Sequence, residues 1–487
     1  MSGLLGIPLL VLTDSYKTSH TLMYPDAKKC VAYGEFRKGY NGDKEDTRVV
    51  FYGIRYMYEI ENYVAIKWTL KDVELAEKFF ATHNAGYTSF PFPKDLILKF
   101  IKENDGYFPI KIEALPDGTP CHVHTPVYQI TAEKEYSLLV TFLETLITMA
   151  WYPSTVATLS RRARDHIEKA YNDTVDNDGY WSLESRLHDF GFRGCTSIEQ
   201  SIIGGSAHLI NFIGTDTMSA AYYVQYHLNN GNPVATSIPA TEHSVMTAHK
   251  SEKDAMLKVI NTFGAGVFAC VMDSYDYKNA LDEILPSVAS GKIGKGGYMV
   301  LRPDSGDQVT VVLMALRAAE KIFGSVKNKK GYKVINGCGV IQGDGVTIDS
   351  LEAILKATGE AGYSAQNVAF GMGGGLLQKL NRDTMSFATK LSHITYADGT
   401  QSLPGEFVVK RNAEGIPIAY PKESFPENDP DNLLRVVYDH GKVFKWDDFD
   451  TIRKRVAKEW PLLPPKFDNI SPALKLKVDN FIRARST

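Results

Sequence analysis

The chain of 487 residues is 44% hydrophobic and 23% charged, an ordinary balance for a globular protein with a large core. Its formal net charge of −3 gives no overall field that would attract nucleic acid or an anionic membrane, so we expect neither as a partner. Five cysteines without CxxC spacing argue against a disulfide framework or a zinc site. Any anion site must therefore be built locally, from a few converging Arg and Lys side chains.

The first twelve residues are apolar but have no basic flank and no obvious cleavage site, so we do not expect a signal peptide. Residues 136–152 form the most apolar long stretch, but Glu144 interrupts it and Pro153 follows it. This pattern predicts a buried helix that ends before Pro153, rather than a membrane span. We therefore expect a cytoplasmic protein.

Residues 1–150 mix short strands and helices. Residues 49–53 and 107–112 have the composition of strands, and residues 73–82 have helical periodicity. We expect this N-terminal part to belong to a second α/β layer outside the catalytic domain.

Residues 386–487 return to hairpin character after the middle of the chain. Alternating runs flank His440-Gly441 within residues 435–444, which predicts a hairpin with its turn there. Residues 447–458 place acidic residues first and basic residues later, as a helix dipole prefers, and residues 421–431 are typical of a loop. We expect this part to pack with the N-terminal part.

Residues 151–385 carry a repeated pattern: a short apolar run, an abrupt polar or glycine-rich cluster, then a helix-like segment. The clusters lie at residues 188–194, 236–243, 271–276, 301–306, 341–345 and 370–375, with a further strand expected at residues 209–213. Buried parallel strands are continuous apolar runs, and chemistry collects at their carboxyl ends in a βα-barrel. We therefore predict an α/β fold with an irregular βα-barrel and one composite active site along its rim.

Glycines gather at the last two clusters. Gly373 and Gly374 open a helix-like segment, and Gly343 with Asp344 lies one repeat earlier. Glycines let backbone N–H groups approach an anion, and the last two loops of a barrel are its usual phosphate site. The alternative is a pair of tight turns. We expect these loops to bind the 5′-phosphate of a sugar.

Charged residues follow three other strands. Arg302 and Asp304 could clamp phosphate and bind sugar hydroxyls or a hydrated Mg²⁺, although a surface ion pair would contain the same residues. A lone histidine is more often structural, but Asp273 on the next strand could orient His243 and support its cationic or phosphorylated form.

Three residues leave alternatives open on the sequence alone. Phe190 suits either core packing or stacking on a planar substrate, with Arg193 nearby for an anion. Asp216 is either a helix N-cap or a buried acceptor for a substrate N–H. Cys195 lies in a rim cluster, but no neighbouring residue indicates a catalytic thiol.

The motifs together resemble the nicotinamide phosphoribosyltransferases, a branch of the type II phosphoribosyltransferase family. The matching residues are Asp14-Ser15-Tyr16-Lys17, His188 to Gly194, Gly214 to Thr217, Glu242-His243, Asp273-Ser274-Tyr275-Asp276, Arg302-Pro303-Asp304-Ser305-Gly306, Gln342-Gly343-Asp344-Gly345, Gly373 to Leu380 and Arg382-Asp383. This resemblance extends over nearly the whole chain. It implies conversion of nicotinamide and phosphoribosyl pyrophosphate to nicotinamide mononucleotide and pyrophosphate, with Mg²⁺ and with ATP as a stimulatory co-substrate; the metal ligands stay unassigned.

The resemblance also implies residue roles. Phe190 would stack on the pyridine ring, Tyr16 of a partner subunit would cover its other face, and Asp216 would accept a bond from the carboxamide. The remaining roles are substrate lining by Arg193 and Arg302, ribose contacts by Asp304 and Asp344, phosphate binding by Gly343, Gly373 and Gly374, pyrophosphate contacts across a homodimer by Arg37, Arg382 and Lys390, and autophosphorylation of His243 beside Asp273. Residues 396–422 are shorter than in animal members, and Lys410 is the lysine considered there for pyrophosphate.

Two rival functions remain. A nicotinate phosphoribosyltransferase would share the fold and the donor, but a carboxylate at Asp216 should repel the acid. A non-catalytic protein that retains the pocket would bind phosphoribosyl pyrophosphate without turnover. An aldolase or isomerase barrel would need a Schiff-base lysine or a paired base at the rim, and the rim has neither.

Overall fold

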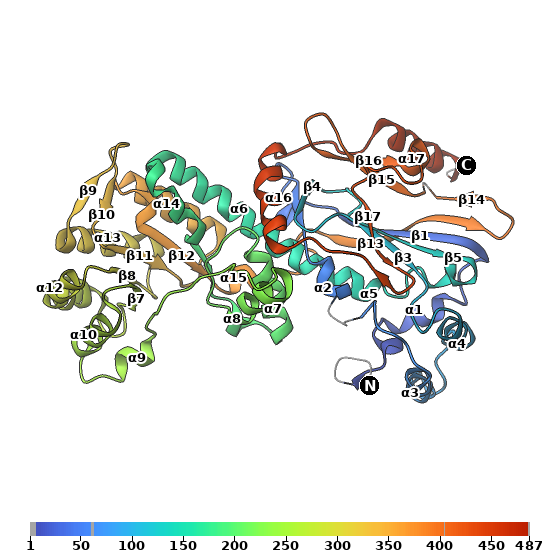
Figure 1. Ribbon diagram of the computed structural model, residues 1–487, viewed down its shortest axis with the longest axis horizontal. Helices are drawn as coiled ribbons and strands as arrows, with labels where there is room; N and C mark the ends of the chain where they lie inside the picture. The colour runs from blue at the N-terminus through green and yellow to red at the C-terminus, as the bar shows by residue number, and fades with distance from the viewer. Residues whose placement is uncertain (1–5, 60–62, 404, 486–487) are drawn as a thin grey trace. The chain divides into compact units, whose positions relative to one another are not determined.

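The computed structural model describes residues 6–59, 63–403 and 405–485. Contacts divide the chain into two compact units (Figure 1). Unit 1 contains residues 1–158 and 381–487, so the two ends of the chain fold together, and unit 2 contains residues 159–380.

Unit 1 is built on a seven-stranded antiparallel sheet. Its strand order is β14 (Gln401–Ser402), β13 (Phe387–Tyr396), β1 (Ala27–Phe36), β5 (Tyr128–Glu133), β3 (Lys111–Ala114), β17 (Arg435–Asp439) and β18 (Lys442–Val443). Two small sheets pair β2 (Arg48–Phe51) with β4 (Thr119–His122) and β15 (Phe407–Arg411) with β16 (Pro417–Pro421). The helices are α1 (Ser15–His20), α2 (Ile54–Glu59), α3 (Leu70–Phe80), α4 (Lys94–Glu103), α5 (Glu144–Ile147), α16 (Phe449–Glu459) and α17 (Pro472–Arg485).

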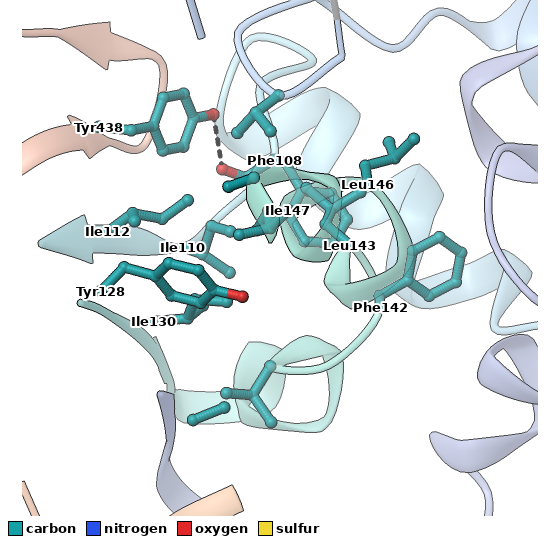
Figure 2. Close-up of a cluster of buried hydrophobic side chains, with 14 of the residues drawn as sticks. Phe108, Ile110, Ile112, Tyr128, Ile130, Phe142, Leu143, Leu146, Ile147 and Tyr438 are labelled. Atoms are coloured by element: carbon teal, nitrogen blue, oxygen red, sulfur yellow. Dashed lines mark hydrogen bonds between the residues drawn. The ribbon is translucent and has the colours of Figure 1, made fainter. Parts of the chain in front are cut away.

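The core of unit 1 joins this sheet to the short helical segments. Figure 2 shows Ile112 of β3 and Ile130 of β5 in one cluster with Leu143 and Ile147, and these side chains are fully or almost fully buried. The Tyr438 hydroxyl donates to the Phe108 carbonyl at 2.9 Å, which satisfies the one polar atom of that ring.

The predicted hairpin at residues 435–444 is confirmed. Its turn residues His440 and Gly441 both have positive φ, 48° and 100°, which a two-residue turn between twisted strands requires. The predicted helices also form, with small shifts: Thr69 and Asp72 make a capping box at the start of α3, and Asp448 caps α16.

The single helix predicted over residues 136–152 is wrong. The stretch consists of a 3-10 segment (Lys134–Leu139), α5 and a second 3-10 turn (Thr148–Ala150) before α6 (Trp151–Thr174). Pro153 lies in the first turn of α6 rather than after a helix. The first turn tolerates proline because its N–H groups have no intrahelical acceptor. The stretch is nevertheless largely buried, as expected.

Unit 2 contains a five-stranded parallel sheet. Its order is β6 (Leu187–Asp189), β12 (Val368–Met372), β11 (Cys338–Gln342), β8 (Tyr298–Arg302) and β7 (Val267–Val271). Most of α6 belongs to this unit. The other helices are α7 (Ile198–His208), α8 (Met218–Tyr223), α9 (His243–Thr247), α10 (Glu252–Phe263), α11 (Tyr277–Asn279), α12 (Leu285–Lys295), α13 (Gln308–Phe323), α14 (Ile348–Glu360) and α15 (Gly374–Leu377). Helices such as α10, α12 and α13 lie outside the strands (Figure 1).

Isolated parallel bridges complete the ring of strands. They join Ala240 to Ala269 of β7, Thr236 to Gly214, and Thr215 to Asp189 of β6. The pairing therefore passes from β7 through residues 236–240 and 214–215 back to β6. The predicted irregular βα-barrel is confirmed.

The strand predicted at residues 209–213 does not form. Helix α7 ends at His208, a turn follows, and pairing begins only at Gly214. The apolar side chains there are buried against other parts of the unit, so their hydrophobicity reflects burial rather than a strand. Among the described residues, no helix is long and apolar enough to cross a membrane.

Candidate active site

A cavity of about 760 Å³ lies at the carboxyl ends of the barrel strands. Its lining is Phe190, Phe192, Arg193, Asp216, Thr217, Glu242, His243, Ser244, Arg302, Asp304, Gly343 and Gly373. Most of the residues predicted from the middle of the chain therefore lie on one cavity.

A second cavity, of about 410 Å³, continues into the barrel. It shares Phe190, Asp216 and Arg302 with the first, and it reaches Val267 and Tyr298 at the beginnings of their strands. Its walls are largely apolar. A flat, apolar ring held near Phe190 and Asp216 would thus lie at the junction of the two cavities.

The Phe190 ring rests on glycine backbone. A Cβ on Gly371 would lie 2.1 Å from its Cε2, and a Cβ on Gly343 would lie 2.9 Å from the same atom. The guanidinium carbon of Arg302 lies 5.5 Å from the ring centroid. Phe190 is only partly buried, so one part of the ring remains available to the cavity. The ring therefore packs on the barrel core and also lines the cavity. Stacking on a planar substrate stays a prediction.

Asp216 presents its carboxylate to the cavity. The Ser237 hydroxyl donates to Oδ1 at 2.6 Å, and the side chain caps no helix, since Thr217 is the N-cap residue of α8. The N-cap interpretation is therefore wrong, and the side chain is exposed rather than buried. Its role as acceptor for a substrate N–H stays a prediction.

His243 begins α9 and faces two carboxylates. Its Nε2 lies 3.1 Å from Oδ1 of Asp273, and its Nδ1 lies 3.9 Å from Oδ2 of Asp304. The Asp273 side chain is only 4% exposed, and its Oδ2 accepts the Asp304 N–H at 3.1 Å and the Ser305 hydroxyl at 2.5 Å. Asp273 is thereby fixed, whereas His243 is 48% exposed and open to a reactant.

Arginines meet carboxylates on two sides of the cavity. Arg302 donates to Oδ1 of Asp304 through Nε at 3.0 Å and through Nη2 at 2.5 Å. Arg193 is largely exposed, with its Nη2 4.0 Å from Oε2 of Glu242. Both cations border the cavity, and guanidinium groups are well suited to binding phosphate.

The two glycine loops differ in which N–H groups they offer. The Gly343 and Asp344 N–H groups both donate to Oε1 of buried Gln342, at 2.8 and 3.3 Å. In the second loop, no bond among the described residues occupies the N–H groups of Gly373 and Gly374. The second loop is therefore the better anion cradle, while Gly343 leaves room for Phe190.

The remaining predicted contacts belong to unit 1. Tyr16 lies in α1 with 55% of its surface exposed, 4.9 Å from the ring of His20 between centroids. Arg37 directly follows β1 and Lys390 lies in the adjacent β13, both exposed. Arg382 donates to the Phe387 carbonyl at 2.9 Å at the start of β13.

Two other candidates have structural partners. Burial raises the pKa of the Cys195 thiol, whose sulfur accepts a bond from Gln378 at 3.2 Å, so it is not an activated thiolate. Lys410 lies 2.7 Å from Asp429, in an ion pair of its own.

Several residues at the site escaped prediction from sequence. Gln342 orders the first glycine loop, Ser237 orients Asp216, and Gly371 supports Phe190. Gly371 lies in the glycine run, which was a usable signal. No local pattern connects Ser237 with Asp216, because the bond depends on how two loops meet. Among the described residues, no three His, Cys, Asp or Glu side chains gather closely enough to hold a metal by themselves.

Comparisons with known proteins agree with this geometry. The model of the nicotinate phosphoribosyltransferase (NAPRTase) family matches residues 185–442, and that of the nicotinamide phosphoribosyltransferase N-terminal domain matches residues 8–112. A nicotinamide phosphoribosyltransferase from Xanthomonas campestris is 39% identical over 79% of this chain and 81% of its own. The Mycoplasma genitalium nicotinamide phosphoribosyltransferase is 31% identical over 79% of this chain and 89% of its own.

Among solved structures, human nicotinic acid phosphoribosyltransferase has a similar fold. It aligns with a TM-score of 0.65 at 16% identity, over 96% of this chain and 100% of the human chain. Because one family model spans more than half of the chain and the Xanthomonas protein is similar over most of both sequences, this chain belongs to the nicotinate phosphoribosyltransferase (NAPRTase) family.

Proposed function

We propose that this enzyme transfers the phosphoribosyl group of phosphoribosyl pyrophosphate to nicotinamide, giving nicotinamide mononucleotide and pyrophosphate in NAD salvage. Family membership supports the reaction class, and the curated relatives named above are nicotinamide phosphoribosyltransferases. The observation that carries the choice of base is the placement of Phe190 and Asp216 on one cavity. A ring can stack on Phe190 while its carboxamide donates to Asp216.

The chemistry suits this site. The pyridine nitrogen attacks C1 of the ribose, the bond from C1 to the pyrophosphate oxygen breaks, and positive charge develops on the sugar in between. The nitrogen carries no proton, so no general base is required. Arg302 and Arg193, which line the cavity, would stabilise negative charge on the leaving group, and the carboxylate of Asp304 would stabilise the positive sugar.

We propose Mg²⁺ as the cofactor of the donor. Mg²⁺ commonly binds through one or two carboxylates together with substrate phosphates, and Asp304 and Asp344 at the ends of β8 and β11 offer suitable oxygens. When bound, it would neutralise negative charge on the pyrophosphate, while the side chains of the protein would orient the ribose and exclude water.

We propose ATP as a stimulatory co-substrate that phosphorylates His243. A ring nitrogen would form a bond to the γ-phosphorus while the bond to the ADP oxygen breaks. Asp273 is suited to orienting the imidazole through Nε2, which leaves Nδ1 towards the cavity side of Asp304. The 48% exposure of His243 supports access by a nucleotide.

We propose a homodimer in which the partner subunit supplies Tyr16, Arg37, Arg382 and Lys390 to the cavity of unit 2. An exposed apolar stripe supports a protein partner: Met218, Tyr222 and Tyr226 follow one another at four-residue spacing, with the two tyrosine rings 4.6 Å apart. Five free cysteines, four of them buried, suit the reducing cytoplasm that we propose as its location.

Complementation tests the shared site. Tyr16→Ala and Phe190→Ala homodimers should each be weakly active, whereas mixing them by reversible dissociation should restore activity, because a heterodimer contains one intact site. No recovery on mixing, or a fully active monomer in sedimentation, would contradict the dimer proposal.

The acid substrate is the specific rival. A carboxylate about 4 Å from Asp216 would cost on the order of 4 kcal/mol at an effective dielectric of 20, roughly a thousandfold in affinity. Initial rates with phosphoribosyl pyrophosphate, Mg²⁺ and either base, with and without ATP, test the proposal. We expect turnover of the amide; binding of the donor without turnover of either base would favour a non-catalytic protein.

A further inference from the structure

Asp189 connects the two residues that are proposed to contact the base. It is the last residue of β6, directly precedes Phe190, and is fully buried. Through a parallel bridge it pairs with Thr215, and its carbonyl accepts the Asp216 N–H at 2.9 Å. The main chain of one residue thus joins the Phe190 segment to the Asp216 segment.

The carboxylate of Asp189 makes a further connection. Oδ1 accepts the Gly191 N–H at 2.7 Å, which holds the turn immediately after Phe190. Oδ2 faces α7, where a Cβ on Gly205 would lie 3.1 Å away. Since Gly205 also packs directly against Ala220 of α8, little space remains for this side chain to move.

The charge of this carboxylate also interacts with Asp216 of the proposed base site. Burial raises the pKa of Asp189 to about 6, the Gly191 N–H and the Thr217 hydroxyl oppose that rise, and the charge of Asp216 adds to it. Asp189 is therefore mostly ionised above pH 7, despite its burial. Above this pKa, Asp189 adds a second negative charge, fully buried, that interacts with the charge of Asp216.

We infer that Asp189 is a positioning and specificity-determining residue: it sets the spacing of Phe190 and Asp216, and its charge disfavours an acidic pyridine. The inference rests on the proposed function and deepens it. Asp189 does not touch the base; it acts through the turn at Gly191 and through the field at Asp216. The hydrogen bond and the charge are separate contributions, so two variants distinguish them.

Asp189→Asn retains an oxygen for the Gly191 N–H but removes the charge. Its kcat/KM for nicotinamide should stay within a few-fold of wild type, while its preference for nicotinamide over nicotinate falls about tenfold, because one of the two negative charges that oppose the acid is removed. Asp189→Ala also leaves the Gly191 N–H without an acceptor, so its KM for nicotinamide should rise about tenfold as well.

The KM for phosphoribosyl pyrophosphate is the internal control and should change little in either variant. An unchanged amide-to-acid ratio in Asp189→Asn would overturn the inference. Equal losses for both bases and the donor would also overturn it. A wild-type enzyme that uses nicotinate or neither base would instead refute the proposed function.

Discussion

The ring of Phe190 lies directly on the backbone of Gly371, so closely that a Cβ there would fall 2.1 Å from Cε2. Gly371 is in β12 and Phe190 follows β6, and the two strands are paired in register at Gly371 and His188. The pairing therefore fixes the height of the ring above the barrel. The absence of a side chain at Gly371 is what makes room for it.

Gly371→Ala should displace the Phe190 ring into the cavity. We expect the KM for nicotinamide to rise about tenfold, the loss of one good stacking contact, with a small change in melting temperature because the ring can yield toward open space. Steady-state kinetics and thermal unfolding check this. Gly359→Ala in α14 is the matched control, since its Cβ meets only Thr174 at 3.7 Å. Unchanged nicotinamide KM in Gly371→Ala would mean that Phe190 does not bear on the base.

Asp216→Asn should weaken the choice between amide and acid. The carboxylate repels nicotinate, and replacing it by an amide removes that repulsion while keeping an oxygen for the carboxamide. We expect the ratio of kcat/KM for nicotinamide to that for nicotinate to fall at least a hundredfold from the estimated thousandfold. Ser237→Ala, which removes only the hydroxyl that donates to Oδ1, should shift the ratio less. If the ratio in Asp216→Asn equals that of wild type, base selection has another origin.

His243→Ala should abolish the increase in rate caused by ATP and leave basal turnover largely intact. Asp273→Asn should reduce the ATP effect about tenfold, because a charge-assisted hydrogen bond to Nε2 is lost. Rates measured with and without ATP, together with phosphate incorporation, provide the readout. His249→Ala is the control, a histidine of the same segment that does not line the cavity. Equal loss of basal and ATP-stimulated rates in His243→Ala would contradict the coupling role.

Asp117 in unit 1 should make stability depend on pH. Its Oδ1 accepts the N–H groups of Gly53 and Ile54, and burial raises the pKa of its carboxyl to about 6. A raised pKa means that the folded state binds the proton more tightly, so this stabilisation is complete below about pH 4 and lost as pH rises through about 6. Asp117→Asn should therefore gain about 2 kcal/mol relative to wild type between pH 4.5 and pH 8.

Urea unfolding of both proteins at the two pH values measures this gain. His122 is a useful contrast, because burial lowers its pKa to about 4, which gives the opposite dependence. A difference between Asp117→Asn and wild type that is the same at pH 4.5 and pH 8 would show that the carboxyl does not titrate as described.

The barrel could be predicted from sequence because its strands are continuous apolar runs that end in polar clusters. Residues 267–271 and 338–342 are of this kind, and burial on both faces leaves little ambiguity. The segments that complete the barrel, residues 214–215 and 236–240, are too short for such a run. They pair with their neighbours only through isolated bridges. Residues 209–213 are apolar because they are buried in the turn after α7, and this apolar run has the same appearance in sequence as a buried strand.

The site residues that directly follow a strand could be predicted from sequence, because a polar residue after an apolar run marks the end of that strand. Three successive barrel segments are followed by His243, Asp273 and Asp304, so the barrel itself brings these side chains together. Two contacts could not be predicted: the Phe190 ring packs on Gly371, and the Gly343 N–H donates to Gln342. Both depend on side-chain directions, which sequence periodicity does not give. The helix predicted at residues 136–152 is wrong for a related reason: an apolar run indicates burial, but it does not distinguish one helix from several short turns.

The most direct test of the account is a competition in one vessel. The enzyme is incubated with equal concentrations of nicotinamide and nicotinate, limiting phosphoribosyl pyrophosphate, and Mg²⁺. The nucleotides formed are then separated and quantified by mass spectrometry. The account predicts nicotinamide mononucleotide in large excess, with pyrophosphate released in equal amount. Nicotinate mononucleotide as the main product would contradict it, because the carboxylate of Asp216 would then not govern the choice of base.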